Sequence, residues 1–213
     1  MSIEKLSGII LAGGSSRRLG FDKGLKKIAG KPIVRYVIEA ISNEVNEIIC
    51  VVESEERRQM YISALNKFAE VYCDKYNVGS PLIGLITGLS HCKYEYAVVV
   101  ACDMPFIQPS LVSFLYNKAL GHNGAVIVNS NNWIEPFLAV YRVTPSLVEA
   151  NRLFRAGDLR LRMVLRNLRD IVYVPITDIN VDNQASISLF DVDTEEKLAF
   201  AEKILSDHLE IHN

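Results

Sequence analysis

The chain has 213 residues, of which 49% are hydrophobic, 23% charged and 8% aromatic. These proportions are typical of a globular protein and argue against disorder and low-complexity structure. The net charge of -2, from 23 basic and 25 acidic residues, argues against a general nucleic-acid-binding protein, which needs a cationic surface. No apolar run approaches the ~18 residues of a membrane-spanning helix, and we expect neither a signal peptide nor a membrane partner.

The four cysteines form no CxxC pair and lack the spacing of metal ligands; they are Cys50, Cys73, Cys92 and Cys102. Three of them lie within or at the end of apolar runs, which favours buried, reduced thiols. We therefore expect a cytoplasmic protein, and composition alone assigns it no activity.

The first half of the chain alternates short apolar runs with amphipathic segments. Apolar runs predict strands at residues 8–12, 48–52, 71–73 and 96–101, and helical periodicity predicts helices at 32–42, 54–68, 81–90 and 109–120. Continuous apolar strands that alternate with helices are typical of a parallel sheet covered on both faces.

The second half is less regular. The patterns predict strands at residues 125–128, 137–141 and 171–175, and helices at 145–156, at 158–168 and from Thr194 onward. Because no linker rich in Pro, Gly or Ser divides the chain, we expect residues 1–213 to form a single α/β domain. Its fold class is a doubly wound, mostly parallel sheet with helices on both faces.

The loop after the first strand has the composition of a phosphate-binding loop. In a doubly wound sheet, ligands bind beyond the carboxyl ends of the strands, where this loop lies. Gly13 and Gly14 would let backbone N–H groups approach phosphate oxygens, and Arg18 and Lys23 would add the positive charge that a triphosphate needs. The run matches neither GxxxxGK[ST] nor GxGxxG, so it is neither a Walker A loop nor a dinucleotide fingerprint. The structural alternative is a tight strand-to-helix turn with solvated basic side chains.

An acidic residue follows the strand at 96–101. Asp103 would lie over the ligand-binding edge of the sheet, where a carboxylate can hold Mg²⁺ against triphosphate oxygens. Such a metal ion offsets the charge that develops on the phosphoryl group and on the leaving pyrophosphate. Alternatively, Asp103 caps the turn before Pro105.

The second half contains a basic segment, with six arginines and one aspartate between Arg152 and Arg169. Its apolar residues Leu161, Val164, Leu165 and Leu168 share one helical stripe, beside a stripe formed by Arg162, Arg166 and Arg169. This segment is either a solvated helix face or a site for the phosphate of a second substrate.

Several of these motifs resemble one known family. The pattern LAGGxSxR-x-G-x-x-K at residues 11–23 resembles the opening of nucleotidyltransferases that activate phosphorylated metabolites. The runs Asp22-Lys-Gly-Leu25, Gly30-Lys-Pro32 and Cys102-Asp-Met-Pro-Phe106 are similar to the molybdenum cofactor guanylyltransferase family. The resemblance extends from Ile9 to about Leu205 and implies a fold of the nucleotide-diphospho-sugar transferase type. It also implies Mg²⁺-dependent transfer of GMP from GTP to the terminal phosphate of molybdopterin, with release of pyrophosphate.

The resemblance further implies roles for individual residues. The implied catalytic residues are Arg18, Lys23 and Asp103. The implied nucleotide-binding residues are Leu11, Ala12, Gly13, Gly14, Lys23, Asp74 and Asp103, with Gly79-Ser-Pro-Leu-Ile-Gly84 similar to the family's nucleoside segment. Asp103 and Asp193 are the implied metal ligands, and Pro136 and Arg160 the implied acceptor contacts. On this basis residues 1–122 form the GTP-binding half and 123–213 the acceptor-binding half, and molybdoenzymes or their chaperones would receive the product.

The C-terminal motif departs from the family pattern. Residues 190–198 resemble the sequence N-x-N-T-P-E-E-L, but Asp191 and Asp193 replace Asn and Glu195 replaces Pro. Asp193 is either a second Mg²⁺ ligand or part of the cap of the helix that starts at Thr194. The Asp-x-Asp-Thr run is also similar to related cytidylyltransferases. A CTP-dependent molybdopterin cytidylyltransferase, or a nucleotidyltransferase for another metabolite phosphate, is therefore the main alternative, and a nucleotide-binding partner protein without turnover is a second.

Overall fold

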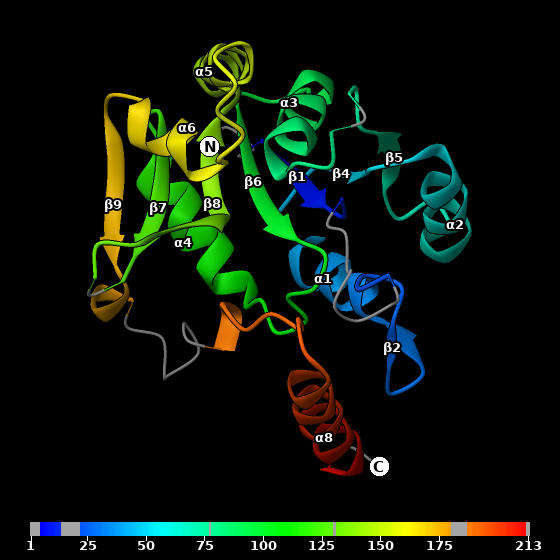
Figure 1. Ribbon diagram of the computed structural model, residues 1–213. Coiled ribbons are helices and arrows are strands. Elements are labelled where there is room, and N and C mark those ends of the chain that lie inside the picture. Colours follow the sequence, from blue (N-terminus) through cyan, green and yellow to red (C-terminus); the bar gives the residue numbers. More distant parts are fainter. Residues whose placement is uncertain (1–4, 14–21, 77, 130, 180–186, 212–213) are drawn as a thin grey trace.

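The computed structural model describes residues 5–13, 22–76, 78–129, 131–179 and 187–211 (Figure 1). Two predicted site residues, Gly14 and Arg18, lie outside these ranges. The described residues form a seven-stranded sheet in the order β5-β4-β1-β6-β8-β7-β9. The strands are β1 (Leu6–Leu11), β4 (Glu47–Val52), β5 (Glu70–Cys73), β6 (Tyr96–Ala101), β7 (Gly124–Val128), β8 (Ile134–Arg142) and β9 (Ile171–Pro175).

Most strands of this sheet are parallel. Strand β1 pairs in parallel with β4 and β6, β4 with β5, and β7 with β9, whereas β8 is antiparallel to both of its neighbours. The predicted fold class, a mostly parallel doubly wound sheet, is confirmed. Strands β4 and β6 are buried and apolar in their centres because helices cover both faces of the sheet.

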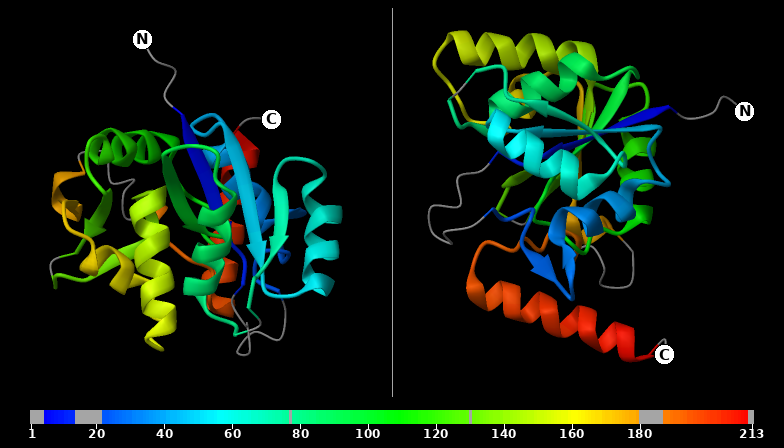
Figure 2. Two further views of the ribbon diagram at one scale, coloured as in Figure 1. Left: turned by 90° about the horizontal axis from the view of Figure 1, so that it is seen from above. Right: turned by 90° about the vertical axis from the view of Figure 1, so that its right-hand side faces the viewer.

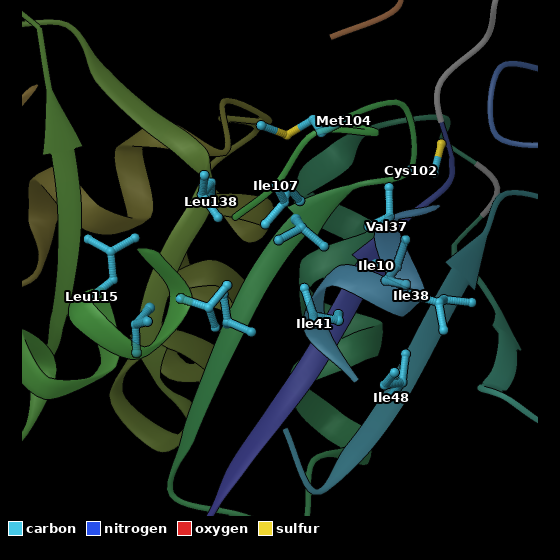
Figure 3. Packing of buried hydrophobic residues seen from close by; sticks show 14 of the residues in the cluster. Ile10, Val37, Ile38, Ile41, Ile48, Cys102, Met104, Ile107, Leu115 and Leu138 are labelled. Atoms are coloured by element: carbon cyan, nitrogen blue, oxygen red, sulfur yellow. The ribbon is translucent and has the colours of Figure 1, made fainter. Parts of the chain in front are cut away.

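Helices cover both faces of the sheet (Figure 2). Residues of α1 (Ile33–Ile41), α2 (Glu55–Leu65) and α4 (Pro109–Ala119) share one apolar cluster with the sheet. Those of α3 (Pro81–His91), α5 (Val143–Arg155) and α6 (Arg162–Asn167) share the cluster on the other face. Figure 3 shows the first cluster, in which Val37, Ile38 and Ile41 of α1 lie against Ile10 of β1.

A third, smaller layer lies beyond the carboxyl edge of the sheet. The hairpin β2 (Lys27–Ile28) and β3 (Lys31–Pro32) packs against α8 (Glu195–Ile211), which stands apart from the main sheet in Figures 1 and 2. The buried residues of this layer are Ile28, Ile33, Phe106, Val192, Leu198 and Ala201. Thr194 caps α8 as predicted, since its hydroxyl accepts the N–H of Lys197 at 3.2 Å.

Several element ends are shifted from the sequence-based bounds, as in β8, which begins at Ile134 rather than at 137, and two differences go further. The β2–β3 hairpin was not predicted; its turn residues Ala29 and Gly30 both have positive φ, but two-residue strands leave no periodic pattern. The helix predicted at 158–168 is shorter, because α6 begins only at Arg162. The Asp158 carboxylate accepts the backbone N–H of Arg160 at 3.0 Å, a local turn that competes with helix formation.

Candidate functional site

A cleft of about 440 Å³ lies at the carboxyl edge of the sheet, and we call it the carboxyl-edge cleft. Its lining comes from the ends of β1, β4, β5 and β6, from the start of α3, and from the beginning of β8. The lining residues are Leu11, Ala12, Gly13, Asp22, Lys23, Val51, Asp74, Ser80, Pro81, Gly84, Ala101, Cys102, Asp103, Met104, Trp133, Glu135, Pro136, Phe137, Leu189 and Asp191. This edge is where doubly wound sheets bind their ligands.

The antiparallel direction of β8 brings a second set of side chains to this edge. Because β8 runs opposite to β6, it starts where the parallel strands end. The register between β7 and β8 shifts near Ala125 and Ile127, and Leu138 adopts a φ of 75° in this irregular stretch. Such bulges re-aim side chains beside active sites. Here the residues before the irregularity, Glu135 to Phe137, line the cleft.

Lys23 and Asp103 form an ion pair just beyond the end of β6, which lies between β1 and β8 in the sheet and so in the middle of the strands that line the cleft. The Lys23 Nζ lies 3.0 Å from Asp103 Oδ2, and the two side chains are 26% and 12% exposed. Burial raises the pKa of Asp103, and the nearby Lys23 ammonium opposes that rise. The cleft therefore contains an ammonium group beside a carboxylate. The Lys23 ammonium can bind an anionic ligand, and the Asp103 carboxylate can bind a metal ion.

Asp22 anchors the segment that positions Lys23. One Asp22 oxygen accepts the hydroxyl of the fully buried Tyr61 at 2.8 Å and the Leu25 N–H at 3.2 Å. The other oxygen lies 3.1 Å from Arg57 Nε. The residue after Lys23 must be glycine, because a Cβ on Gly24 would lie 2.3 Å from the Tyr61 hydroxyl and 3.1 Å from Cys102.

Asp74 lies at one end of the cleft, between two glycines. A Cβ on Gly13 would lie 3.6 Å from Asp74 Oδ2, and one on Gly84 would lie 3.6 Å from Asp74 Oδ1. Among the described residues, Asp74 Oδ1 is a buried oxygen without a hydrogen-bond partner. Burial, with a smaller effect of Glu53, raises the pKa of Asp74 to about 7. A buried, unpaired acceptor beside open space is suited to the N–H groups of a ligand.

Trp133, Glu135, Pro136 and Phe137 line the other end of the cleft. Glu135 accepts the backbone N–H of Phe137 at 3.1 Å, and burial raises the pKa of its carboxyl to about 7. Trp133 is 49% exposed although it belongs to the most hydrophobic class of side chains. This end therefore combines an exposed aromatic ring with one titratable carboxyl.

The segment before α8 closes over Asp103. The backbone N–H of Val192 donates to the Asp103 carbonyl at 2.8 Å. Asp191 lines the cleft, whereas Asp193 does not belong to the lining and pairs with Lys197 at 2.8 Å. The Lys197 ammonium also lies 2.5 Å from Asp191 Oδ1 and lowers the pKa of Asp193. Of the two C-terminal aspartates, Asp191 is thus the one that faces the ligand space.

Three arginines of the basic segment have partners within the protein. The Arg160 guanidinium makes two contacts with Asp158, at 2.9 and 2.7 Å, on the exposed surface. Arg162 stacks on the Trp133 ring at 4.3 Å, and Arg166 donates to the Asn132 carbonyl at 3.3 Å. None of these three lines the cleft. Two of them fasten the β7–β8 turn to α6, and Arg160 and Arg166 are exposed, as expected for a solvated helix face.

The structure brings most of the predicted site residues together. Those that line the cleft are Leu11, Ala12, Gly13, Lys23, Asp74, Asp103 and Pro136. Asp193 and Arg160 lie outside the lining, and Gly14 and Arg18 lie outside the described residues. Sequence reasoning missed Trp133, Glu135 and Phe137 as cleft residues. Only their position beside the predicted Pro136 could have indicated them, because the antiparallel direction of β8 is not visible in the sequence.

The described residues include no group of three or more His, Cys, Asp or Glu side chains arranged for a metal ion. A metal ion in the cleft would therefore take one or two protein carboxylates and complete its shell with ligand oxygens and water. That arrangement is common for Mg²⁺ with nucleotides. In the part of the chain that the structure describes, no helix is long and apolar enough to cross a membrane.

The fold and this cleft define a nucleotide-binding α/β protein of the nucleotidyltransferase class. Residues 8–172 match the model of the MobA-like NTP transferase domain, and the chain belongs to this family. The resemblance to molybdenum cofactor guanylyltransferases, which the motifs indicate, is confirmed. Membership of this family makes the chain a transferase. Members of this family generally use a divalent metal ion.

Named relatives agree with this assignment. A probable molybdenum cofactor guanylyltransferase from Natronomonas pharaonis is 34% identical over 203 residues, covering 94% of this chain and 98% of the relative. A molybdenum cofactor guanylyltransferase from Pseudomonas entomophila is 34% identical over 163 residues, covering 74% and 80%. The crystal structure of molybdopterin-guanine dinucleotide biosynthesis protein A from Archaeoglobus fulgidus has a TM-score of 0.80 at 26% identity, covering 94% of this chain and 99% of that one.

Proposed function

We propose that the protein transfers GMP from GTP to the terminal phosphate of molybdopterin and releases pyrophosphate. In this reaction an oxygen of the acceptor phosphate attacks the α-phosphorus, and the bond from the α-phosphorus to the bridging oxygen of pyrophosphate breaks. The acceptor phosphate is already an anion near neutral pH, so no general base is needed. Alignment and charge neutralisation are the main sources of catalysis. The names of the relatives support the choice of substrates.

The Lys23–Asp103 pair in the middle of the cleft is the observation on which this proposal rests. Lys23 lies between the Asp74 end and the Trp133 end, so its ammonium can neutralise both the α-phosphate and the incoming acceptor phosphate. We propose that Gly13, with Gly14 and Arg18, holds the β- and γ-phosphates. Leu11 and Ala12, at the end of β1, form the floor beneath the nucleoside.

Asp74 is the proposed guanine contact. Its buried, unpartnered oxygen can accept N–H groups from the Watson–Crick edge of guanine, which presents two adjacent donors. The edge of cytosine offers only its amino group beside acceptors, so a carboxylate favours guanine over cytosine. This geometry favours GTP over CTP, in agreement with the names of the relatives.

Mg²⁺ is the proposed metal ion, with Asp103 as its ligand. The buried Asp103 carboxylate has oxygen donors of the kind Mg²⁺ prefers, and it lies beside the cation that would face the same phosphates. The metal ion would supply charge neutralisation at the triphosphate. The family resemblance implies Asp193 as a second ligand. Because Asp191 lines the cleft whereas Asp193 pairs with Lys197, we propose Asp191 for this role instead.

We propose that residues 1–122 bind GTP and that residues 123–213 bind the acceptor, with Pro136 in contact with molybdopterin. A cytoplasmic location, where nucleoside triphosphates are abundant, belongs to the same proposal, as do molybdoenzymes or their chaperones as recipients of the product.

The test is pyrophosphate release measured with each of the four nucleoside triphosphates, with and without molybdopterin. GTP should give turnover that depends on molybdopterin and Mg²⁺, and the dinucleotide product should appear in equal amount. Turnover with CTP in preference to GTP would instead assign a cytidylyltransferase. GTP binding without any pyrophosphate release would assign a nucleotide-binding partner protein.

A further inference from the structure

The β7–β8 turn holds a single tryptophan at the rim of the cleft. Trp133 is the one tryptophan of the chain, lines the cleft and is 49% exposed. Large aromatic side chains bury most of their surface in a folded protein, and a half-exposed ring at a binding cleft is typical of a ligand contact.

The protein holds this ring in place by several contacts. The Asn129 side chain accepts the N–H groups of Asn131 and Trp133, each at 3.0 Å, and the Trp133 carbonyl accepts the Asn129 N–H at 3.0 Å. Asn132 supports the turn with a φ of 56°, a conformation that asparagine tolerates better than most residues. These hydrogen bonds therefore hold the backbone of the turn at Trp133.

Helix α6 supports the ring from behind the turn. The Arg162 guanidinium lies 4.3 Å from the centre of the Trp133 ring, and Arg166 donates to the Asn132 carbonyl at 3.3 Å. Residues Val164 and Leu165 are fully buried, so α6 itself is fixed to the core. A ring that is ordered before a ligand arrives loses little conformational entropy on binding, which makes stacking on it more favourable.

We propose that Trp133 is a stacking platform for a planar fused heteroaromatic ring, the pterin of the acceptor, and that Arg162 positions the platform. This inference rests on the proposed function, because it takes the acceptor to be a pterin phosphate. Along the sheet, Asp74 follows β5, and Trp133 and Pro136 lie at the start of β8 on the other side of β6. Lys23 pairs with Asp103, which follows β6 and so lies between them, as a reaction between two phosphorylated substrates requires. The basic segment thus contributes to acceptor binding through the ring that Arg162 supports.

The first experiment measures steady-state kinetics of Trp133→Ala with molybdopterin and GTP varied separately. Loss of a stacked ring should raise the KM for molybdopterin about tenfold, by analogy with the stacking of nucleobases on aromatic side chains. The KM for GTP should stay within twofold. Trp133→Tyr should recover most of the loss, and Arg162→Ala should raise the KM for molybdopterin by a smaller factor.

Arg152→Ala is the matched control, since Arg152 belongs to the same basic segment but pairs with Glu149 of α5. An unchanged KM for molybdopterin in Arg152→Ala supports the stacking role. If Arg152→Ala reproduces the effect of Trp133→Ala, or if Trp133→Ala leaves the KM for molybdopterin unchanged while transfer proceeds, the proposal is wrong.

The second experiment does not depend on turnover. Because Trp133 is the single tryptophan, its fluorescence reports directly on this position. A pterin with a phosphomonoester side chain should quench it saturably, whereas ribose 5-phosphate should not. If the wild-type protein does not use molybdopterin, the proposed function is wrong. The quenching experiment still tests whether a pterin binds at Trp133. Saturable quenching by the pterin phosphate supports it, and no quenching, or equal quenching by ribose 5-phosphate, overturns it.

Discussion

The two ends of the carboxyl-edge cleft are built in different ways. At the Asp74 end, the lining comes from the ends of consecutive parallel strands and from the start of α3, and glycines leave room beside a buried carboxylate. At the Trp133 end, the lining comes from one antiparallel strand with an irregular register and from the turn that precedes it. Short sequence motifs therefore encode the first end, whereas the second depends on strand direction and on contacts with α6.

The difference also concerns charge. Near the middle of the cleft, Lys23 and Asp103 face the ligand space as a pair. Around the other end, the arginines are bound to Asp158, to Trp133 and to a backbone carbonyl. From charge alone, both the segment of Lys23 and the basic segment at residues 152–169 are possible phosphate sites. Among the described residues, Lys23 lines the cleft, whereas the arginines of the basic segment do not.

Asp103→Asn should have the largest effect. The variant keeps the size of the side chain but removes the negative charge that would hold Mg²⁺, so turnover should fall by roughly 10²–10³-fold while the fold is retained. Pyrophosphate release with GTP and molybdopterin measures the loss, and circular dichroism checks the fold. Pyrophosphate release at a rate near that of the wild type would remove Asp103 from the mechanism.

Lys23→Ala should have the next largest effect, a fall of about 10²-fold in kcat/KM. Without the ammonium, the α-phosphate and the acceptor phosphate repel each other with no charge between them. Lys31→Ala is the matched control, because Lys31 is an exposed lysine of β3 that pairs with Glu39 at 2.6 Å. Equal rates for the two variants would show that the position of the charge in the cleft does not matter.

The pH dependence of GTP binding tests the Asp74 end. Burial raises the pKa of Asp74 to about 7. Its ionised form accepts guanine N–H groups, so the KM for GTP should rise about tenfold from pH 8 to pH 6 as the carboxylate is protonated. Since the folded pKa is raised, the ligand-free protein should also lose the stability contributed by Asp74 as pH rises from about 4 through about 7.

Asp74→Asn isolates this titration from the other groups of the cleft. Glu135, whose pKa burial also raises to about 7, remains in the variant. The KM for GTP of Asp74→Asn should therefore be higher than that of the wild type at pH 8 and should change little between pH 8 and pH 6. A parallel rise in both proteins would assign the titration to another group.

Tyr61→Phe should have a smaller effect, on both stability and turnover. It removes the hydroxyl that donates to Asp22 at 2.8 Å and leaves the buried ring in place. We expect the free energy of unfolding to fall by about 1–2 kcal/mol and kcat to fall a few-fold, because Asp22 anchors the segment of Lys23. Chemical denaturation and steady-state rates measure the two effects. A drop in stability without any change in kcat would show that the network only supports the fold.

The sequence predicts many residues that line the Asp74 end of the cleft, because they follow apolar strands in local motifs. Gly13 follows β1 and Asp103 follows β6, and each position could be inferred from a run of fewer than ten residues. Asp22 was visible only as part of a motif, because its partners Tyr61 and Arg57 lie in α2. The predicted parallel strands and their helices also follow from local periodicity.

The Trp133 end of the cleft could not be predicted in the same way. That Glu135 and Phe137 line the cleft depends on the antiparallel pairing of β8 with β6, a long-range choice that leaves no periodic pattern. The partner of Arg162 is a tryptophan that lies 29 residues earlier in the chain. Spacing alone also left Asp191 and Asp193 undistinguished, and the contacts of Lys197 with the two aspartates become visible only in the fold.

Arg160→Ala should have the smallest effect. It separates the role of Arg160, which pairs with Asp158, from that of Arg162, which stacks on Trp133. The family resemblance implies an acceptor contact for Arg160, but its guanidinium is exposed and held by Asp158 at 2.7 Å. Exposed pairs of this kind contribute little to stability, so we expect changes of less than about twofold in the KM for molybdopterin and little change in stability. Steady-state kinetics beside Arg162→Ala measures the difference. A larger rise in the KM for molybdopterin for Arg160→Ala than for Arg162→Ala would show that Arg160 leaves Asp158 when the acceptor binds, and that the acceptor phosphate extends beyond the cleft toward the basic segment.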